Sequence, residues 1–249
     1  MAARIRILGI TGRMGRLLRE EVEAAGATVA GGTSRGGGMT DPAALARLAD
    51  VLVDFTHAEA AVPHARAAAA AGVPLVLGTS GLSPDAEAAL REAASRIPVV
   101  YSANFAPGIV LLLALASRMA AALPAEEYDA EIVEMHHRQK VDAPSGTAVL
   151  LGRAVAAGRG TTLEAAGREA GRDGHSGPRG TGTIGFAALR GGQVVGEHTL
   201  LFASGSEHVA LTHRAFDRRV FATGAVRAAL WVLGKPPGLY DMTHVLGVA

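Results

Sequence analysis

Close to its N-terminus the chain contains Ile5-Arg-Ile-Leu-Gly9-Ile-Thr-Gly12-Arg-Met-Gly15, a run with three evenly spaced glycines. The apolar, β-branched residues before Gly9 predict a strand, and apolar residues at helical spacing from Met14 predict a helix after the glycines. In that setting Gly9 permits a tight turn, Gly12 lets backbone N–H groups approach a pyrophosphate, and Gly15 permits close packing of the helix. We interpret the run as a dinucleotide site. Its spacing differs from the usual G-x-G-x-x-G, so an ordinary glycine-rich turn is the alternative.

Strands and helices continue to alternate through the first part of the chain, which predicts an α/β fold with a Rossmann-type parallel sheet. We expect strands at 27–31, 51–55, 75–77 and 99–101, and helices at 58–71 and 83–94. The last helix has a favourable start in Ser83-Pro84, because serine caps a helix and proline suits its first position.

The pattern changes near Asn104, where a second domain is expected to begin. We predict a helix at 109–122, a strand at 129–135, a helix opening at Ser145, and strands at 183–189, 193–202 and 208–214. The turn Arg190-Gly191-Gly192 predicts a hairpin between the first two of those last strands. Glycines recur so often at 159–182 that we expect a loop without regular structure there. An apolar helix at 224–233 is expected to return to the first domain.

Composition excludes several classes of protein. Lys+Arg 24 against Asp+Glu 23 gives a net charge of +1, which lacks the positive field that a nucleic-acid partner requires. The chain has no cysteine, which excludes disulfides and thiolate chemistry. Its longest apolar run, 108–117, is too short to span a membrane, and Arg6 interrupts any signal-like N-terminus. We therefore expect a cytoplasmic protein with no membrane partner.

The end of the second predicted strand bears on the choice of cofactor. An NAD site usually has an acidic residue about 20 residues after the glycine turn. Residues 24–40 contain no acid, and the strand ends at Ser34-Arg35, a hydroxyl and a guanidinium that suit a 2′-phosphate. We expect NADPH to be preferred, with NADH possible; a solvated loop arginine is the alternative reading of Arg35.

Two more loops follow predicted strands and are expected at the same edge of the sheet, bordering the nicotinamide. Each taken alone would be a plain turn. The predicted cofactor-binding residues are Gly9, Ile10, Thr11, Gly12, Arg13, Met14, Ser34, Arg35, Gly78, Thr79, Ser80, Ser102, Ala103, Asn104 and Phe105.

The densest group of charged residues is Glu134-Met-His136-His137-Arg138-Gln-Lys140-Val-Asp142-Ala-Pro144-Ser145-Gly146-Thr147. Arginine and lysine among the histidines would repel a cation, so we predict no metal site. The start of a helix at Ser145 offers hydroxyls and free N–H groups that can donate hydrogen bonds to a carboxylate. We predict an anion site in which neighbouring positive charges lower the pKa of His136. A solvated charged turn, with Ser145 as a routine helix cap, is the alternative.

This run resembles the signature of the 4-hydroxy-tetrahydrodipicolinate (dihydrodipicolinate) reductase family. Other segments resemble the family in the same order along nearly the whole chain. They are the Gly9–Gly15 turn, Asp54-Phe55-Thr56, Gly78-Thr79-Ser80-Gly81, Asn104-Phe105, Gly182-Thr183-Ile184-Gly185-Phe186, Val195-Gly196-Glu197-His198 and 224–231. The chain departs from the family in having Ser34 where many relatives carry glutamate, which favours NADPH over dual cofactor use.

The resemblance implies a Rossmann-type dinucleotide-binding domain, residues 1–106 plus 217–249. It also implies an inserted α+β mixed-sheet domain, residues 107–216, that binds substrate and forms a homotetramer. The implied reaction is the NAD(P)H-dependent reduction of a small dicarboxylate at ring C4, in lysine and diaminopimelate biosynthesis. Carried over by motif, His136 and Lys140 handle protons, while His137, Ser145, Gly146 and Thr147 bind substrate.

Two other functions stay open on sequence grounds. One is another Rossmann oxidoreductase of the homoserine or aspartate dehydrogenase type, which would not need the run from His136 to Thr147. The other is a non-catalytic NADP(H) sensor, which would tolerate loss of that run.

Overall fold

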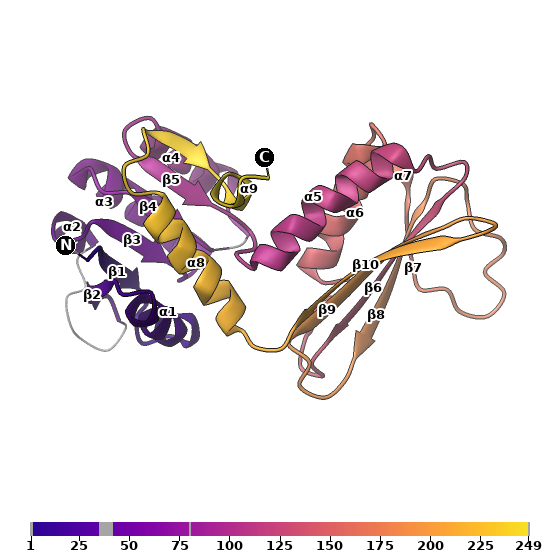
Figure 1. Cartoon of the computed structure of the whole chain (residues 1–249), viewed down its shortest axis with the longest axis horizontal. Helices are drawn as coiled ribbons and strands as arrows, with labels where there is room; N and C mark the ends of the chain where they lie inside the picture. Colours follow the sequence, from indigo (N-terminus) through magenta and orange to yellow (C-terminus); the bar gives the residue numbers. More distant parts are fainter. Residues whose placement is uncertain (1, 35–41, 80, 249) are drawn as a thin grey trace. The chain divides into compact units, whose positions relative to one another are not determined.

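The computed structural model describes residues 2–34, 42–79 and 81–248. The chain divides into two compact units, Met1–Pro107 with Arg219–Ala249, and Gly108–Arg218 (Figure 1). Each unit contains its own β-sheet and its own helices.

Within the described residues the first unit contains a six-stranded parallel sheet in the order β11-β5-β4-β3-β1-β2. The strands are β1 (Arg4–Leu8), β2 (Thr28–Gly32), β3 (Val51–Asp54), β4 (Leu75–Leu77), β5 (Pro98–Tyr101) and β11 (Gly238–Tyr240). The chain leaves β1 for β2 on one side and returns to β3 on the other, so the strand order reverses at β1. Ligands of doubly wound sheets bind beyond the carboxyl ends of the strands at such a reversal. The predicted Rossmann-type sheet is confirmed.

The helices of this unit are α1 (Arg13–Ala24), α2 (Pro42–Arg47), η1 (Ala58–Ala60), α3 (Ala61–Ala71), α4 (Pro84–Ala94), α8 (Arg219–Trp231) and α9 (Met242–Leu246). Ser83 caps α4 by accepting the N–H of Ala86, as predicted. Alanines dominate the core between the sheet and α2, α3 and α4, so these helices approach one another closely. The helix predicted at 224–233 is α8, which returns to the first unit and lies beside α1.

Within the described residues the second unit contains a five-stranded mixed sheet in the order β10-β9-β6-β8-β7. Its elements are α5 (Pro107–Ala122), β6 (Asp129–His136), α6 (Gly146–Gly158), α7 (Leu163–Ala166), β7 (Arg168–Ala170), β8 (Ile184–Arg190), β9 (Gly196–Ala203) and β10 (His208–Ala215). One face of the sheet is covered by α6. α5 packs closely on α6, because a Cβ added to Gly158 of α6 would lie only 2.1 Å from the carbonyl oxygen of Ser117 in α5.

The predicted hairpin between the strands now identified as β8 and β9 is wrong. β6 lies between them, pairing parallel to β8 and antiparallel to β9. One face of β6 is buried along its whole length, as expected of a central strand, and a local turn signal cannot reveal that position. The antiparallel neighbour of β9 on its other side is β10.

The expectation of an irregular loop at 159–182 is also wrong in part, because α7 and β7 form within it. Thr162 caps α7 by accepting the N–H of Ala165. Arg172 binds Glu131 of β6 through two hydrogen bonds of 2.8 and 2.9 Å. Arg179 also donates to Glu131, at 2.9 Å. These long-range ion pairs order a segment whose own glycines would not.

No helix in the described part of the chain meets the length and apolarity needed to cross a membrane. The most apolar long helix, α5, has 16 residues. At a rise of about 1.5 Å per residue, 16 residues span about 24 Å, less than a hydrocarbon core of about 30 Å.

Candidate functional site

The glycine turn of the first unit has the geometry that its sequence predicted. Gly9 has a φ of +78°, which favours glycine, and its N–H donates to Oγ1 of Thr33 at 2.9 Å. Gly12 is the N-cap of α1. A Cβ on Gly15 would lie 2.2 Å from the carbonyl oxygen of Gly9. The first N–H groups of a helix lack partners within the helix, so this turn is suited to hold a pyrophosphate.

Further loops follow β3, β4 and β5 at the carboxyl edge of the same sheet. A Cβ on Gly78 would collide with the ring of Phe55 at 2.2 Å, and that ring lies 5.2 Å from the ring of Phe105. Ser102 donates from Oγ to the carbonyl of Asn104 at 2.7 Å. Packing around the ring of Phe55 therefore joins the loops after β3, β4 and β5, and the hydrogen bond of Ser102 closes a turn within the last of these loops.

The other predicted cofactor residues lie along this edge with different exposure. Thr11, Arg13 and Ala103 are exposed, Ile10, Met14 and Ser34 are half-buried, and Thr79 is buried. In the part of the chain that the structure describes, the buried Oγ1 of Thr79 has no hydrogen-bond partner. Arg35 and Ser80 lie outside the described residues.

The site in the second unit is built around the carboxylate of Glu134, which is fully buried on β6. Arg190, at the end of β8, donates two hydrogen bonds of 2.8 Å to its two oxygens. Nδ1 of His136 lies 2.6 Å from Oε2 of Glu134, and the N–H of Ser145 donates to Oε1 at 3.0 Å. One carboxylate thus joins two strands and the start of α6.

Ser145 links the start of α6 to a second buried histidine. Its Oγ accepts the N–H of Ala148 at 3.2 Å, which caps the helix, and lies 3.0 Å from Nε2 of His198 on β9. The rings of His136 and His198 meet edge to face at 5.1 Å. The next residues, Gly146 and Thr147, begin α6, and a Cβ on Gly146 would meet no atom within 4 Å. Open space therefore adjoins the N–H groups that could donate hydrogen bonds to a carboxylate.

Lys140 and His137 lie on the loop that leads from β6 to α6. Nζ of Lys140 donates to Oδ1 of Asp142 at 2.8 Å, and Arg190 donates to the carbonyl oxygen of Asp142 at 2.6 Å. Nε2 of His137 lies 3.4 Å from the guanidinium of Arg218. Asp142 and Glu134 thus pair with Lys140 and Arg190, so carboxylates balance part of the positive charge around this loop.

Burial dominates the electrostatics of the histidines. Desolvation lowers the pKa of His136, despite the opposing effect of Glu134, and the nearby charges of Lys140 and Arg190 lower it further. The direction that we predicted is confirmed, although like charge is a smaller cause than burial. Desolvation also lowers the pKa of His198 to about 4. Burial acts to raise the pKa of Glu134, but hydrogen bonds from Arg190, His136 and Ser145 lower it overall.

In the described ranges, no group of three or more His, Asp or Glu side chains is arranged to hold a metal ion. The carboxylate nearest the two buried histidines, Glu134, is already bound by Arg190.

Sequence reasoning assigned no role to Glu134, Arg190 or His198. The sequence did contain a signal for Glu134. A strand places every second residue on the same face, so Glu134 shares one face of β6 with Ala130, Ile132 and His136. Two ionisable residues in the buried register of an amphipathic strand indicate a polar centre inside the core. Arg190 and His198 reach the site because β8 and β9 pair with β6, and no local sequence pattern indicated that pairing.

Two family models match the chain end to end: "Dihydrodipicolinate reductase, N-terminus" matches residues 3–105, and "Dihydrodipicolinate reductase, C-terminus" matches residues 108–246. A 4-hydroxy-tetrahydrodipicolinate reductase of Granulibacter bethesdensis is 62% identical over 98% of this chain and 97% of its own length. The corresponding protein of Acidiphilium cryptum is 61% identical, with 98% of each chain covered.

Among solved structures, a dipicolinate-bound dihydrodipicolinate reductase from Paenisporosarcina sp. TG-14 aligns with a TM-score of 0.75 and 22% identity. The alignment covers 97% of this chain and 98% of that chain. A probable dehydrogenase from Thermotoga maritima aligns with a TM-score of 0.59 and 9% identity over 98% and 93% of the two chains. At these identities the structures show a shared fold.

The buried histidines predict a pH-dependent stability. Because the pKa of His198 is about 4 in the folded chain and about 6.5 when unfolded, only the unfolded chain binds this proton between those values. The free energy of unfolding of the second unit should therefore fall as the pH falls from about 7 to 4, with a contribution of about 3 kcal/mol from His198. Denaturant unfolding across this range, in wild type and His198→Asn, measures it. A variant that kept the full wild-type pH dependence would contradict this assignment.

Proposed function

The chain belongs to the dihydrodipicolinate reductase family, and on that premise we propose how its own residues carry out the reaction. It is an NAD(P)H-dependent oxidoreductase that reduces 4-hydroxy-tetrahydrodipicolinate in lysine and diaminopimelate biosynthesis. The two functions that the sequence left open, a dehydrogenase of homoserine or aspartate type and a non-catalytic sensor, are set aside by this membership.

We propose that the first unit, 1–107 with 219–249, binds the nucleotide at the carboxyl edge of its sheet. The turn between β1 and α1 is suited to a pyrophosphate, because the first N–H groups of α1 have no partner within the helix. The turn is also tightly packed, since a Cβ on Gly15 would collide with the carbonyl oxygen of Gly9. Ser102, Ala103, Asn104 and Phe105 follow β5 at that edge and are assigned to the nicotinamide side, with Gly78 and Thr79. The bound nucleotide supplies a hydride to the substrate. Among the described residues the buried hydroxyl of Thr79 has no hydrogen-bond partner, which supports a ligand at this edge.

We propose that the second unit, 108–218, binds the dicarboxylate substrate at the start of α6. The N–H groups of Gly146 and Thr147 would donate hydrogen bonds to one carboxylate, and the positive end of the helix dipole would attract it. Ser145 caps the helix and so holds those groups in place. His137, which lies beside Arg218, is assigned to substrate contact.

The observation that carries the catalytic proposal is the hydrogen bond between Nδ1 of His136 and the buried carboxylate of Glu134, at 2.6 Å. A carboxylate accepts hydrogen bonds, so Nδ1 carries the proton and Nε2 is left to exchange one with the substrate. Nε2 lies 3.0 Å from where a Cβ on Gly196 would be, so a side chain at this position would crowd the ring. Lys140 is assigned as the second proton-handling group, and its bond to Asp142 holds Nζ in place.

The catalytic proposal is tested by a coupled assay with aspartate semialdehyde, pyruvate and the preceding synthase, following the nucleotide absorbance. Lys140→Ala should lower kcat by about 100-fold, the size expected of a lost general acid, and should alter the pH profile. Arg138→Ala is the matched control, since Arg138 is an exposed cation of the same loop, and it should behave as wild type. If Lys140→Ala kept the kcat and pH profile of wild type, the role of Lys140 would be refuted.

We also propose that NADPH is preferred over NADH. The support is the absence of any acidic residue from 24 to 40 and the pair Ser34-Arg35 after β2, because a guanidinium forms charge-assisted hydrogen bonds with a 2′-phosphate. Arg35→Ala should raise the KM for NADPH by about tenfold and leave the KM for NADH unchanged, as a lost charged hydrogen bond predicts. Steady-state kinetics with both nucleotides measures the two values. Equal effects on both would argue against this preference.

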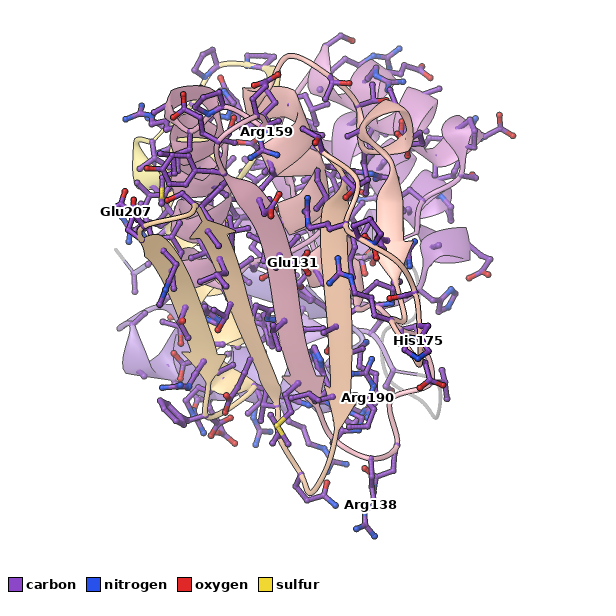
Figure 2. The ribbon with its side chains drawn as sticks, turned by 90° about the vertical axis from the view of Figure 1, so that its right-hand side faces the viewer. Glu131, Arg138, Arg159, His175, Arg190 and Glu207 are labelled. Atoms are coloured by element: carbon purple, nitrogen blue, oxygen red, sulfur yellow. The ribbon has the colours of Figure 1, made fainter. Side chains whose placement is uncertain are left out.

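We propose that the chain forms a homotetramer through the outer face of the second sheet. Figure 2 shows this face, with Glu131 of β6 near its centre and no helix in front of the strands. Val133 and Leu189 are exposed on it by 38% and 51%. Exposed apolar side chains on an uncovered sheet indicate an association surface.

The oligomer proposal is tested by Leu189→Asp, which should shift the particle mass in analytical ultracentrifugation toward smaller species. A charge buried in an apolar interface is strongly unfavourable. Leu239→Asp, an exposed leucine of β11 in the other unit, is the matched control and should leave the mass unchanged. A tetramer that persisted in Leu189→Asp at low concentration would exclude this face.

A further inference from the structure

A second fully buried carboxylate, that of Asp54, lies at the carboxyl end of β3 in the first unit. β3 is the strand beside β1 at the reversal of strand order, and Asp54 pairs in register with Leu8, the residue before the glycine turn. The side chain is not among the cofactor residues proposed above.

Three hydrogen bonds surround this carboxylate. Oδ1 accepts the backbone N–H of Thr56 at 2.8 Å and the hydroxyl of Thr56 at 2.6 Å. Oδ2 lies 2.6 Å from Nδ1 of His64 in α3, whose side chain is 12% exposed. An ionised carboxylate can only accept, so His64 donates from Nδ1. Without such donors a buried charge would be costly.

The network touches the turn assigned to the pyrophosphate. The methyl group of Thr56 lies 2.9 Å from where a Cβ on Gly9 would be, so Thr56 packs directly against that glycine. The backbone oxygen of Asp54 also accepts the N–H of Gly78 at 2.9 Å, which ties in the loop after β4. A carboxylate placed here with a donor missing would repel the phosphates of a bound dinucleotide.

We propose that His64 is a positioning residue for the dinucleotide: it offsets the charge of Asp54 at the phosphate turn and keeps Thr56 packed on Gly9. The proposal rests on nucleotide binding by the first unit. It concerns affinity and not the chemical step, because His64 acts through Asp54 and Thr56.

The test is the Kd for NADPH, measured by titration calorimetry on the full chain. His64→Leu leaves Asp54 without one donor and should weaken binding by about tenfold, as for a lost hydrogen bond to a charged group. In the double variant Asp54→Asn with His64→Leu the charge is gone, so binding should return to within about threefold of wild type. His64→Gln, which keeps an N–H donor, should also bind nearly as wild type.

The chain offers a matched control in Asp241 and His244. Nδ1 of His244 lies 2.7 Å from Oδ1 of Asp241, the same kind of pair at the cap of α9. His244→Leu should leave the Kd unchanged, which separates the effect of this location from that of losing any His–Asp pair. Thermal melts show that each variant is folded.

The outcomes separate the inference from the proposed function. If the wild type does not bind NADPH, both fail. If it binds and His64→Leu binds equally well, or if the folded double variant stays as weak as His64→Leu, the role of His64 is refuted while the nucleotide site stands. If His64→Leu does not fold, the double variant and His64→Gln decide: recovered binding in both supports the proposal, and weak binding in either overturns it.

Discussion

Burying the charge of Glu134 in the second unit would cost several kcal/mol if nothing bound it. Four hydrogen bonds together offset that cost: two from Arg190, one from the imidazole of His136 and one from the N–H of Ser145. Because these donors come from β8, β6 and the start of α6, the carboxylate holds all three elements in one arrangement. The orientation of His136 and the position of the α6 N-terminus both follow from this contact. A buried polar network of this kind stabilises a site only when each of its polar groups has a hydrogen-bond partner.

The first unit uses the same physical device at its own site. Asp54 is as fully buried as Glu134, and it too is satisfied by a histidine and a backbone N–H, with a threonine hydroxyl in place of the arginine. In both units the carboxylate ends or nearly ends a strand, where the ladder of backbone hydrogen bonds stops and loops begin. Loops have few apolar contacts to order them. A buried carboxylate that accepts several hydrogen bonds holds the start of each loop in one conformation. It thereby fixes the positions of the side chains and N–H groups that we propose bind a ligand.

Prediction from sequence succeeded where the determinant was local. Ser83 and Ser145 cap α4 and α6 as expected, because a cap depends on residues within one turn. The glycine turn and the strands of the first sheet other than β11 were also recognised from short patterns, whereas β11 was not predicted. It failed at the hairpin between β8 and β9, because β6, more than forty residues earlier in the chain, inserts between them. It failed at α7 and β7 because Arg172 and Arg179 bind Glu131 across a similar separation. A cytoplasmic location stays a prediction.

The sequence by itself determined the family, the alternation of strands and helices, the glycine turn and the residues around His136 and Lys140, since each depends on residue type at short spacing. Only the tertiary structure decided which charges meet. It paired Lys140 with Asp142 and Arg190 with Glu134. It also brought His198 to Ser145, and His64 to Asp54. The physical reason is that strand order and burial set these distances, and a pKa such as that of His198 follows from burial that no local pattern reports.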